Sequence, residues 1–208
     1  MIRFLKLFTL AAGLLAVLSS CSGIRNEYQE KMMFRLEASP QMAAFQDQKT
    51  GQGLLVKRFS ISPEFESSLF MYRVNKNRFG SDFYNNYVVP PAQMITDLIM
   101  ENLYASPLFS PVSPNSMDDI QYQLWGKIIE LYGDIRDKKH LKAVVTIRMR
   151  LDKNEDGTFK PVNHKTYTAN FTLSEPSPEA YIDGLNQGLT KIMNDFFEDL
   201  KVAGMNSK

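Results

Sequence analysis

The stretch LKAVVTIRMRL, residues 141–151, decides the fold class predicted for this chain. Apolar side chains occupy every second position without a break, and most positions between them carry lysine, threonine or arginine. Since successive side chains of a strand point to opposite faces, this alternation predicts a strand with one buried and one solvated face. Such strands are typical of antiparallel sheets whose second face is open to solvent.

Two further long strands are expected beside this stretch. The turn NEDG, residues 154–157, is predicted to lead to a partner strand whose buried face spans residues 167–173. Upstream, the apolar residues of 120–124 stand at even-numbered positions, whereas those of 129–131 stand at odd-numbered positions. Gly126 lies between the two sets. We therefore predict a β-bulge or bend at Gly126.

The first half of the chain is expected to add shorter strands. Runs rich in branched and aromatic residues predict strands at residues 32–36, 53–61, 69–74, 82–89 and 108–112. Gly80 and Ser81 are predicted to form the turn before the fourth run, and residues 39–53 a loop. Pro90 and Pro91 are expected to end the fourth run, because proline has no backbone donor for the ladder.

Two amphipathic helices complete the prediction. The first follows Pro91 and has one apolar stripe formed by Ile95, Leu98, Ile99 and Leu103. The second opens at Ser177-Pro178-Glu179 and ends near Gly204, and its stripe is Ile182, Leu185, Leu189, Ile192, Phe196 and Leu200. Together these elements predict an α+β fold, a two-layer sandwich of a mainly antiparallel sheet of roughly seven strands with both helices on one face.

The N-terminal residues have the pattern of a secretory signal. Arg3 and Lys6 precede an apolar run at residues 7–18, and small residues then lead to Cys21, the only cysteine. As a helix the apolar run would rise roughly 18 Å, which is short of the ~30 Å hydrocarbon core of a bilayer. The tetrapeptide ending at Cys21 resembles the bacterial lipobox. This resemblance implies cleavage before Cys21, followed by attachment of diacylglycerol to its sulfur and acylation of its amine.

The alternative is a soluble secreted protein whose signal happens to end near a cysteine. An exported free thiol with no pairing partner would be unusual, so we favour the lipoprotein interpretation. The predicted organisation is a signal peptide at 1–20, a lipidated tether at 21–31, a single domain at 32–204 and a tail at 205–208.

The composition fits a packed domain without nucleic acid as a partner. Lysine and arginine number 24 against 23 aspartates and glutamates, so charge gives no reason to expect nucleic-acid binding or a polybasic membrane patch. One cysteine allows no disulfide within the chain, and stability must come from packing. A hydrophobic content of 44% and an aromatic content of 12% can supply it.

No catalytic or metal-binding constellation is indicated. The two histidines, His140 and His164, lie in polar stretches without an evident orienting partner. The carboxylates at 118–119 would point apart in an extended chain. Residues 152–156 have the spacing of calcium-loop ligands, but Asn163 stands where the loop needs glutamate, and a hairpin turn explains them better. Phosphate-loop, GxSxG and HExxH motifs are missing. We predict no enzyme, no metal and no cofactor.

Residues 71–112 resemble a known family as a block. Met71-Tyr72-Arg73 precedes the aromatic run YNNYVVPP at 84–91, and Met94-Ile95 and a helix follow. This order is similar to that of the ABC-type transport auxiliary lipoproteins, the PqiC-like family, in which a Tyr-Arg strand precedes an aromatic strand, a double proline and a helix. The tripeptide at 124–126, LWG, is similar to the family's L-x-G strand.

The resemblance implies a TolB N-terminal-like fold and a non-catalytic accessory role in lipid transport. In such systems an ABC permease and ATPase of the inner membrane work with an MCE-domain protein that spans the periplasm. The lipoprotein would lie on the periplasmic face of the outer membrane and dock or receive the end of that bridge. Ser22, directly after the cysteine, resembles lipoproteins forwarded to the outer membrane. Direct binding of phospholipid and homo-oligomer formation both stay open.

Two other functions stay open beside this one. The first is an envelope assembly or scaffolding lipoprotein that shares the fold, since a fold does not define a function. The second is a lipid-anchored hydrolase, which would need a concave site where an acid, a base or a nucleophile converge.

Aromatic residues and arginine in the 71–91 block are the candidate partner-binding residues, because both types are enriched at interfaces. These candidates are Tyr72, Arg73, Tyr84, Tyr87, Pro90 and Pro91. In the alternative interpretation Tyr72 and Tyr87 pack across strands, and Arg73 satisfies a carboxylate or a helix end.

Overall fold

The computed structural model describes residues 30–41, 51–115 and 120–202. Residues from Lys31 onward form one compact unit, which is separate from Met1–Glu30. The predicted signal peptide, Cys21 and Ser22 lie outside the described residues. The same holds for the 118–119 carboxylates, Gly204 and most of the predicted 39–53 loop.

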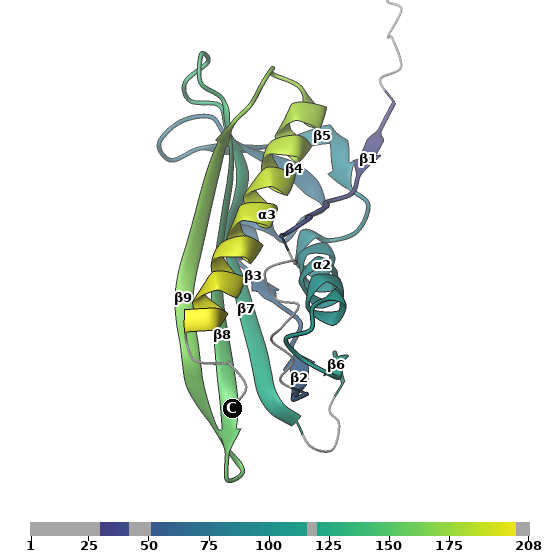
Figure 1. Ribbon diagram of the computed structural model, residues 1–208. Helices are drawn as coiled ribbons and strands as arrows, with labels where there is room; N and C mark the ends of the chain where they lie inside the picture. The colour runs from purple at the N-terminus through teal and green to yellow at the C-terminus, as the bar shows by residue number, and fades with distance from the viewer. Residues whose placement is uncertain (1–29, 42–50, 116–119, 203–208) are drawn as a thin grey trace, which may run out of the picture. The chain divides into compact units, whose positions relative to one another are not determined.

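Nine strands form one mixed sheet in the described part of the chain. They are β1 (Met32–Phe34), β2 (Gly53–Val56), β3 (Ser60–Ile61), β4 (Leu69–Arg73), β5 (Phe79–Tyr87), β6 (Val112–Ser113), β7 (Ile120–Asp134), β8 (Lys142–Glu155) and β9 (Thr158–Thr172), as Figure 1 shows. The three longest, β7, β8 and β9, pair antiparallel in sequence order. β2, β3 and β4 pair with the other edge of β7 one after another, all parallel to it.

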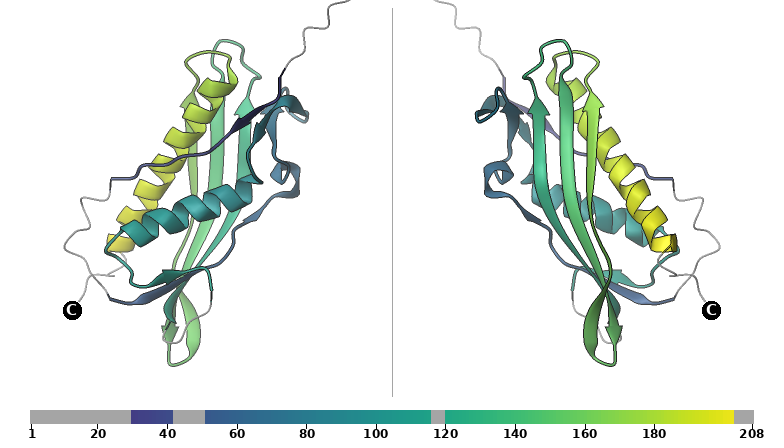
Figure 2. Two further views of the ribbon diagram at one scale, coloured as in Figure 1. Left: turned by 90° about the vertical axis from the view of Figure 1, so that its right-hand side faces the viewer. Right: turned by 90° about the vertical axis from the view of Figure 1, so that its left-hand side faces the viewer.

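Two α-helices, α2 (Pro91–Ala105) and α3 (Pro178–Val202), cover one face of this sheet. Figure 2 shows both helices in front of the long strands in one view and behind them in the other. All six residues of the predicted second stripe are buried. The hydroxyl of Ser177 accepts the N–H of Ala180 at 3.1 Å and so caps α3. The predicted α+β two-layer fold is confirmed, with the sheet mixed and its long pairs antiparallel.

Residues 142–151 belong to β8, as the alternation predicts, although Val144 and Thr146 on the second face are also buried. Ala143, Val145, Ile147, Met149 and Leu151 are at most 1% exposed and face the helices. The predicted hairpin turn follows, with φ of 51° at Asp156 and 85° at Gly157. Two successive positive φ values match the right-handed twist of the flanking strands. The N–H of Gly157 also donates to Asn154 Oδ1 at 2.8 Å.

The predicted bulge at Gly126 is wrong in position. Gly126 pairs in regular register with Met149, and the shift falls between Ile128 and Glu130. Glycine is required at 126 for a different reason, because a Cβ there would lie 2.1 Å from Cδ2 of the Phe59 ring. The bulge therefore lies where the apolar residues of β7 switch from one alternation to the other, beginning two residues after Gly126.

The predicted turn at Gly80 and Ser81 is also wrong, because both residues lie inside β5. The chain reverses earlier, where the N–H of Val74 donates to the carbonyl of Arg78 at 2.9 Å. The Asn75 side chain supports this reversal by accepting the N–H of Asn77 at 3.0 Å. Asparagine makes such turns by bonding the backbone two residues on, which needs no glycine.

Two predicted strands are shorter in the structure. The 53–61 run is divided into β2 and β3, which contact successive parts of β7. The 108–112 run contributes only its last residue to β6. Leu108 and Phe109 are buried without strand geometry, and the Ser110–Pro111 peptide bond is cis.

An extended segment, residues 35–41, runs along α3 and is held by side chains of that helix. Three alternate N–H groups donate to three acceptors spaced four residues apart: Glu37 to Asn186 Oδ1 (2.8 Å), Ser39 to Thr190 Oγ1 (3.1 Å) and Gln41 to Asn194 Oδ1 (2.8 Å). Four helical residues rise about 6 Å, and two extended residues span about 6.6 Å. The two spacings match, so this ladder positions β1 and the start of the compact unit.

Candidate functional site

The six candidate partner-binding residues lie together in sequence, but the structure divides them by exposure. Tyr84 and Pro90 are exposed, Tyr72 and Arg73 are half-buried, and Tyr87 and Pro91 are buried. The side chains of the last two therefore belong to the core and do not face a partner in this conformation. Cys21, the predicted lipid attachment site, lies outside the described residues.

Tyr87 belongs to an aromatic cluster between β4, β5 and α3. The ring centroid of Phe70 lies 4.8 Å from that of Tyr87 and 5.1 Å from that of Tyr181, and Tyr72 lies 5.4 Å from Tyr181. The hydroxyl groups of Tyr87 and Tyr181 form a buried hydrogen bond of 3.1 Å. Tyr87 thus packs across strands against Phe70, as the packing alternative expects, whereas Tyr72 packs against Tyr181 of the helix.

Burial raises the pKa of Tyr87, and burial raises that of Tyr181 well above its ordinary value of 10. The folded protein therefore keeps both protons at a pH where the unfolded chain loses them. Because the unfolded state then binds fewer protons, stability should fall as the pH rises above about 10, by roughly 1.4 kcal/mol per pH unit for each tyrosine. Urea unfolding between pH 8 and 11 measures this slope. In the Tyr87→Phe variant the slope should be smaller, and an unchanged slope would contradict the assignment.

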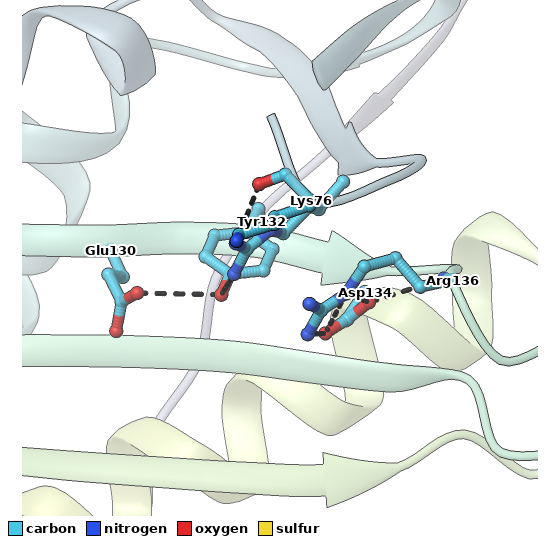
Figure 3. A network of polar contacts seen from close by, with 6 residues as sticks. Lys76, Glu130, Tyr132, Asp134 and Arg136 are labelled. Atoms are coloured by element: carbon cyan, nitrogen blue, oxygen red, sulfur yellow. Dashed lines mark hydrogen bonds and ion pairs between the residues drawn. The ribbon is translucent and has the colours of Figure 1, made fainter. Parts of the chain in front are cut away.

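Arg73 joins the β4–β5 turn to β7, and Figure 3 shows its neighbours Lys76, Tyr132 and Glu130. Its Nη2 donates to the carbonyl of Lys76 at 2.9 Å, and its Nη1 donates to the hydroxyl of Tyr132 at 3.4 Å. Tyr132 in turn donates to Glu130 Oε1 at 3.4 Å. The acceptors of Arg73 are thus a backbone carbonyl and a phenol, and not the carboxylate or helix end of the alternative interpretation. Its guanidinium positions a turn.

The side chain of Asp82 forms a bulge in β5. Its Oδ1 accepts the N–H groups of Tyr84 at 2.9 Å and Asn85 at 3.2 Å. The pairing with β4 accordingly jumps from Ser81 to Asn86. Residues in such a bulge leave the ladder, and their side chains are re-aimed. Phe83 is 62% exposed as a result.

Around this bulge lies an exposed apolar surface, which we call the β1–β5 surface and define as Lys31, Met32, Met33, Phe83 and Tyr84. Nζ of Lys31 lies 3.9 Å above the Phe83 ring, and the rings of Phe83 and Tyr84 meet edge to face at 5.3 Å. Met33 is 69% exposed on β1, a strand at the end of the sheet order. Aromatic and methionine side chains are enriched at interfaces, and grouped exposed apolar side chains mark interaction sites.

Sequence reasoning found only Tyr84 of this surface. Phe83 and Tyr84 are adjacent, so in any regular strand one of the two rings would have to leave the core face. That signal was present in the sequence. Met32 and Met33 are also adjacent, which signals exposure for one of them, but the exposure of both depends on β1 being a short strand paired with β5.

The described residues offer little for catalysis. No group of three or more histidine, cysteine, aspartate or glutamate side chains in the described ranges could hold a metal ion. His140 Nδ1 contacts Asp137 at 2.8 Å on an exposed turn. Asp152, one of the calcium-like ligands, is paired with Arg150 at 2.7 Å. Of the helices described, none combines the length and the apolar character needed to cross a membrane.

The structure thus defines an α+β protein with a mixed sheet covered by two helices. The same fold occurs in a Xanthomonas campestris protein from a family of unknown function, DUF330, with a TM-score of 0.70, 16% identity, and coverage of 83% of this chain and 96% of that one. A second solved structure, of an uncharacterised protein, has a TM-score of 0.65, 13% identity and coverage of 82% and 99%. At these identities the likeness shows a shared fold. No family model and no curated protein matches the chain.

Proposed function

We propose that this protein is an outer-membrane-anchored accessory lipoprotein of an MCE/ABC-type intermembrane lipid transport system. Its domain docks a periplasmic partner and carries out no reaction. The observation that carries the proposal is the β1–β5 surface, where the exposed rings of Phe83 and Tyr84 meet at a bulge beneath Lys31, and the neighbouring strand β1 adds the exposed Met32 and Met33.

Two further considerations support this function. Lys31 is the last residue of the predicted tether and Met32 and Met33 directly follow it, so this surface lies close in sequence to the predicted lipid attachment at Cys21. The resemblance of the 71–112 block to the transport auxiliary lipoproteins names the kind of machine. Within that block, the bulge residues lie between the Tyr-Arg strand and the double proline, so the proposed docking surface lies inside the segment that carries the resemblance.

An envelope scaffolding role is the second candidate, because the same surface would serve a partner from another machine. The β1–β5 surface itself favours neither machine over the other. A lipid-anchored hydrolase is not favoured by any specific observation in the described residues, where His140 pairs with Asp137 and Asp152 pairs with Arg150.

The test is photo-crosslinking in the native host. A photoreactive amino acid placed at Phe83 should trap an MCE-domain protein that spans the periplasm. The matched control is Tyr104, an aromatic residue on α2 that is 75% exposed and outside the surface. Crosslinks from Phe83 alone support docking at this surface, and equal capture from both positions contradicts it.

A second arm measures affinity. Phe83→Ser should lower recovery of the partner in a pull-down by about thirtyfold if Phe83 is a hot spot worth ~2 kcal/mol. Tyr104→Ser should leave recovery unchanged. Capture of an outer-membrane assembly protein in place of the MCE-domain protein would favour the scaffolding role.

A further inference from the structure

The face of the sheet opposite the helices contains an open hollow of about 340 Å³. Figure 2, in its right-hand view, looks onto this face, with the three long strands in front of both helices. The side chains that matter in the hollow are Ser60, Trp125, Lys127, Arg148, Arg150 and His164. None of them belongs to the β1–β5 surface, and none was a candidate site residue.

Strand register arranges these side chains as a grid. Arg150 pairs with Trp125 on one side and His164 on the other, and these three form one row. Arg148 pairs with Lys127, which pairs with Ser60, and these three form the next row. Neighbouring strands lie about 4.8 Å apart, and rows two residues apart lie about 6.8 Å apart. The basic groups of three strands therefore reach one small area.

The charge in this area is only partly compensated. Nη2 of Arg150 lies 2.7 Å from Asp152 Oδ2, so this guanidinium has a carboxylate partner. Arg148 bonds only the hydroxyl of Thr166, at 3.3 Å. Among the described residues neither Arg148 nor Lys127 forms an ion pair. Two cations side by side without a carboxylate between them repel each other, and a bound anion would relieve this repulsion.

The hollow also provides an apolar wall. Trp125 is 42% exposed, and its ring has Lys57 Nζ at 5.7 Å and the Arg150 guanidinium at 5.7 Å. These cations hold the indole in place over a polar face. A partly exposed indole beside two free cations suits a molecule with an anionic group and a short organic part.

We propose that this hollow binds a phosphate group esterified to a small polar alcohol. Arg148 offers a planar fork for two phosphate oxygens and Lys127 a point charge for the third. Ser60, whose hydroxyl donates to the carbonyl of Gly126 at 3.4 Å, and His164 also line the hollow, and Trp125 packs against the alcohol. Such a group comes either from a phospholipid headgroup or from a soluble phosphate ester. The lipid source rests on the proposed transport function, whereas phosphate binding rests on the hollow alone.

Binding in the hollow can be followed by intrinsic fluorescence, because Trp125 is the only tryptophan in the sequence. We suggest titrating the detergent-purified protein, in the processed form that its host makes, with glycerol phosphate, inorganic phosphate and glycerol. The two phosphates should change tryptophan fluorescence saturably at millimolar concentrations or below, and glycerol should not. A saturable response to neither phosphate would overturn the proposal.

Variants test whether the response comes from the hollow. Arg148→Gln and Lys127→Gln should each weaken binding at least tenfold. Lys142→Gln is the matched control, since Lys142 lies on the same strand and face about 20 Å from Arg148. Equal weakening by Lys142→Gln, or binding of a tetraglutamate peptide as tight as that of glycerol phosphate, would overturn a phosphate site. Circular dichroism checks that each variant is folded.

Two lipid arms identify the source. Micelles doped with phosphatidylglycerol should bind more tightly than glycerol phosphate if the source is a headgroup, and micelles doped with diacylglycerol should not respond. Equal affinity for phosphatidylglycerol and glycerol phosphate supports a soluble ester at the same site. Loss of every fluorescence response while crosslinking from Phe83 persists would overturn the phosphate site and leave the docking function standing.

Discussion

Gly126→Ala is expected to lower the free energy of unfolding by about 3 kcal/mol, although it adds a single methyl group. The new Cβ would lie 2.1 Å from two carbons of the Phe59 ring, far inside van der Waals contact. Phe59 cannot retreat easily, because it is 2% exposed and its N–H donates to Thr96 Oγ1 on α2 at 3.1 Å. Overpacking of this kind forces backbone shifts or strained rotamers.

A double-mutant cycle identifies the clash. Phe59→Ala alone should cost about 3–5 kcal/mol through the cavity it leaves. In that background Gly126→Ala should cost little, because the ring it meets is gone, so the coupling free energy should be about 2 kcal/mol or more. Urea unfolding followed by circular dichroism measures all four corners. Additive costs would show that the glycine serves some purpose other than admitting Phe59.

Phe70→Ala should be the most destabilising truncation in the aromatic cluster, at about 3–5 kcal/mol. Phe70 is fully buried and contacts the rings of Phe34, Tyr87 and Tyr181 at 5.2, 4.8 and 5.1 Å. Its removal leaves a cavity where β4, β5 and α3 meet. It also removes the ring that packs against both Tyr87 and Tyr181, so the hydrogen bond between their hydroxyls loses its support.

Phe83→Ala is the matched control, since it removes the same side chain from the bulge thirteen residues further along the chain. Phe83 is 62% exposed, so its truncation should change the free energy of unfolding by less than about 0.5 kcal/mol. Thermal and urea unfolding compare the two variants directly. A large loss of stability in Phe83→Ala would mean that the bulge supports the fold and is not a free surface.

These predictions separate stability from function along the chain. The positions with large expected stability effects lie at the helix-covered face, whereas the β1–β5 surface and the basic hollow consist of exposed or half-exposed side chains. The two functional proposals use different strands, so variants in one should leave the other unchanged.

Local patterns were sufficient for the parts of the fold whose reason is local. The unbroken alternation at 141–151 predicted β8 because a period of two exists only in extended chain. The stripe at 182–200 predicted α3 because its period matches the helical turn. The hairpin turn at Asp156 and Gly157 was predicted because these residue types tolerate positive φ. In each of these the cause lies within a few residues of its effect.

The parts that sequence reasoning missed have causes far away in the chain. The role of Gly126 depends on Phe59, which reaches it only because β3 pairs with the middle of β7. Tyr87 was a candidate for a partner surface, yet Tyr181 on α3 encloses it. The pattern of residue types within a segment could not reveal either contact, because the two residues of each contact are far apart in the sequence.

The sequence by itself therefore determined the long strands, the two helices and the α+β class, since periodicity is a property of consecutive residues. Only the tertiary structure decided which side chains of these elements are free to bind. The bulge that exposes Phe83 and the grid that joins Lys127, Arg148 and His164 both depend on strand register. Register is set by the packing of the whole sheet against its helices, and a shift of one residue would turn each of these side chains to the other face.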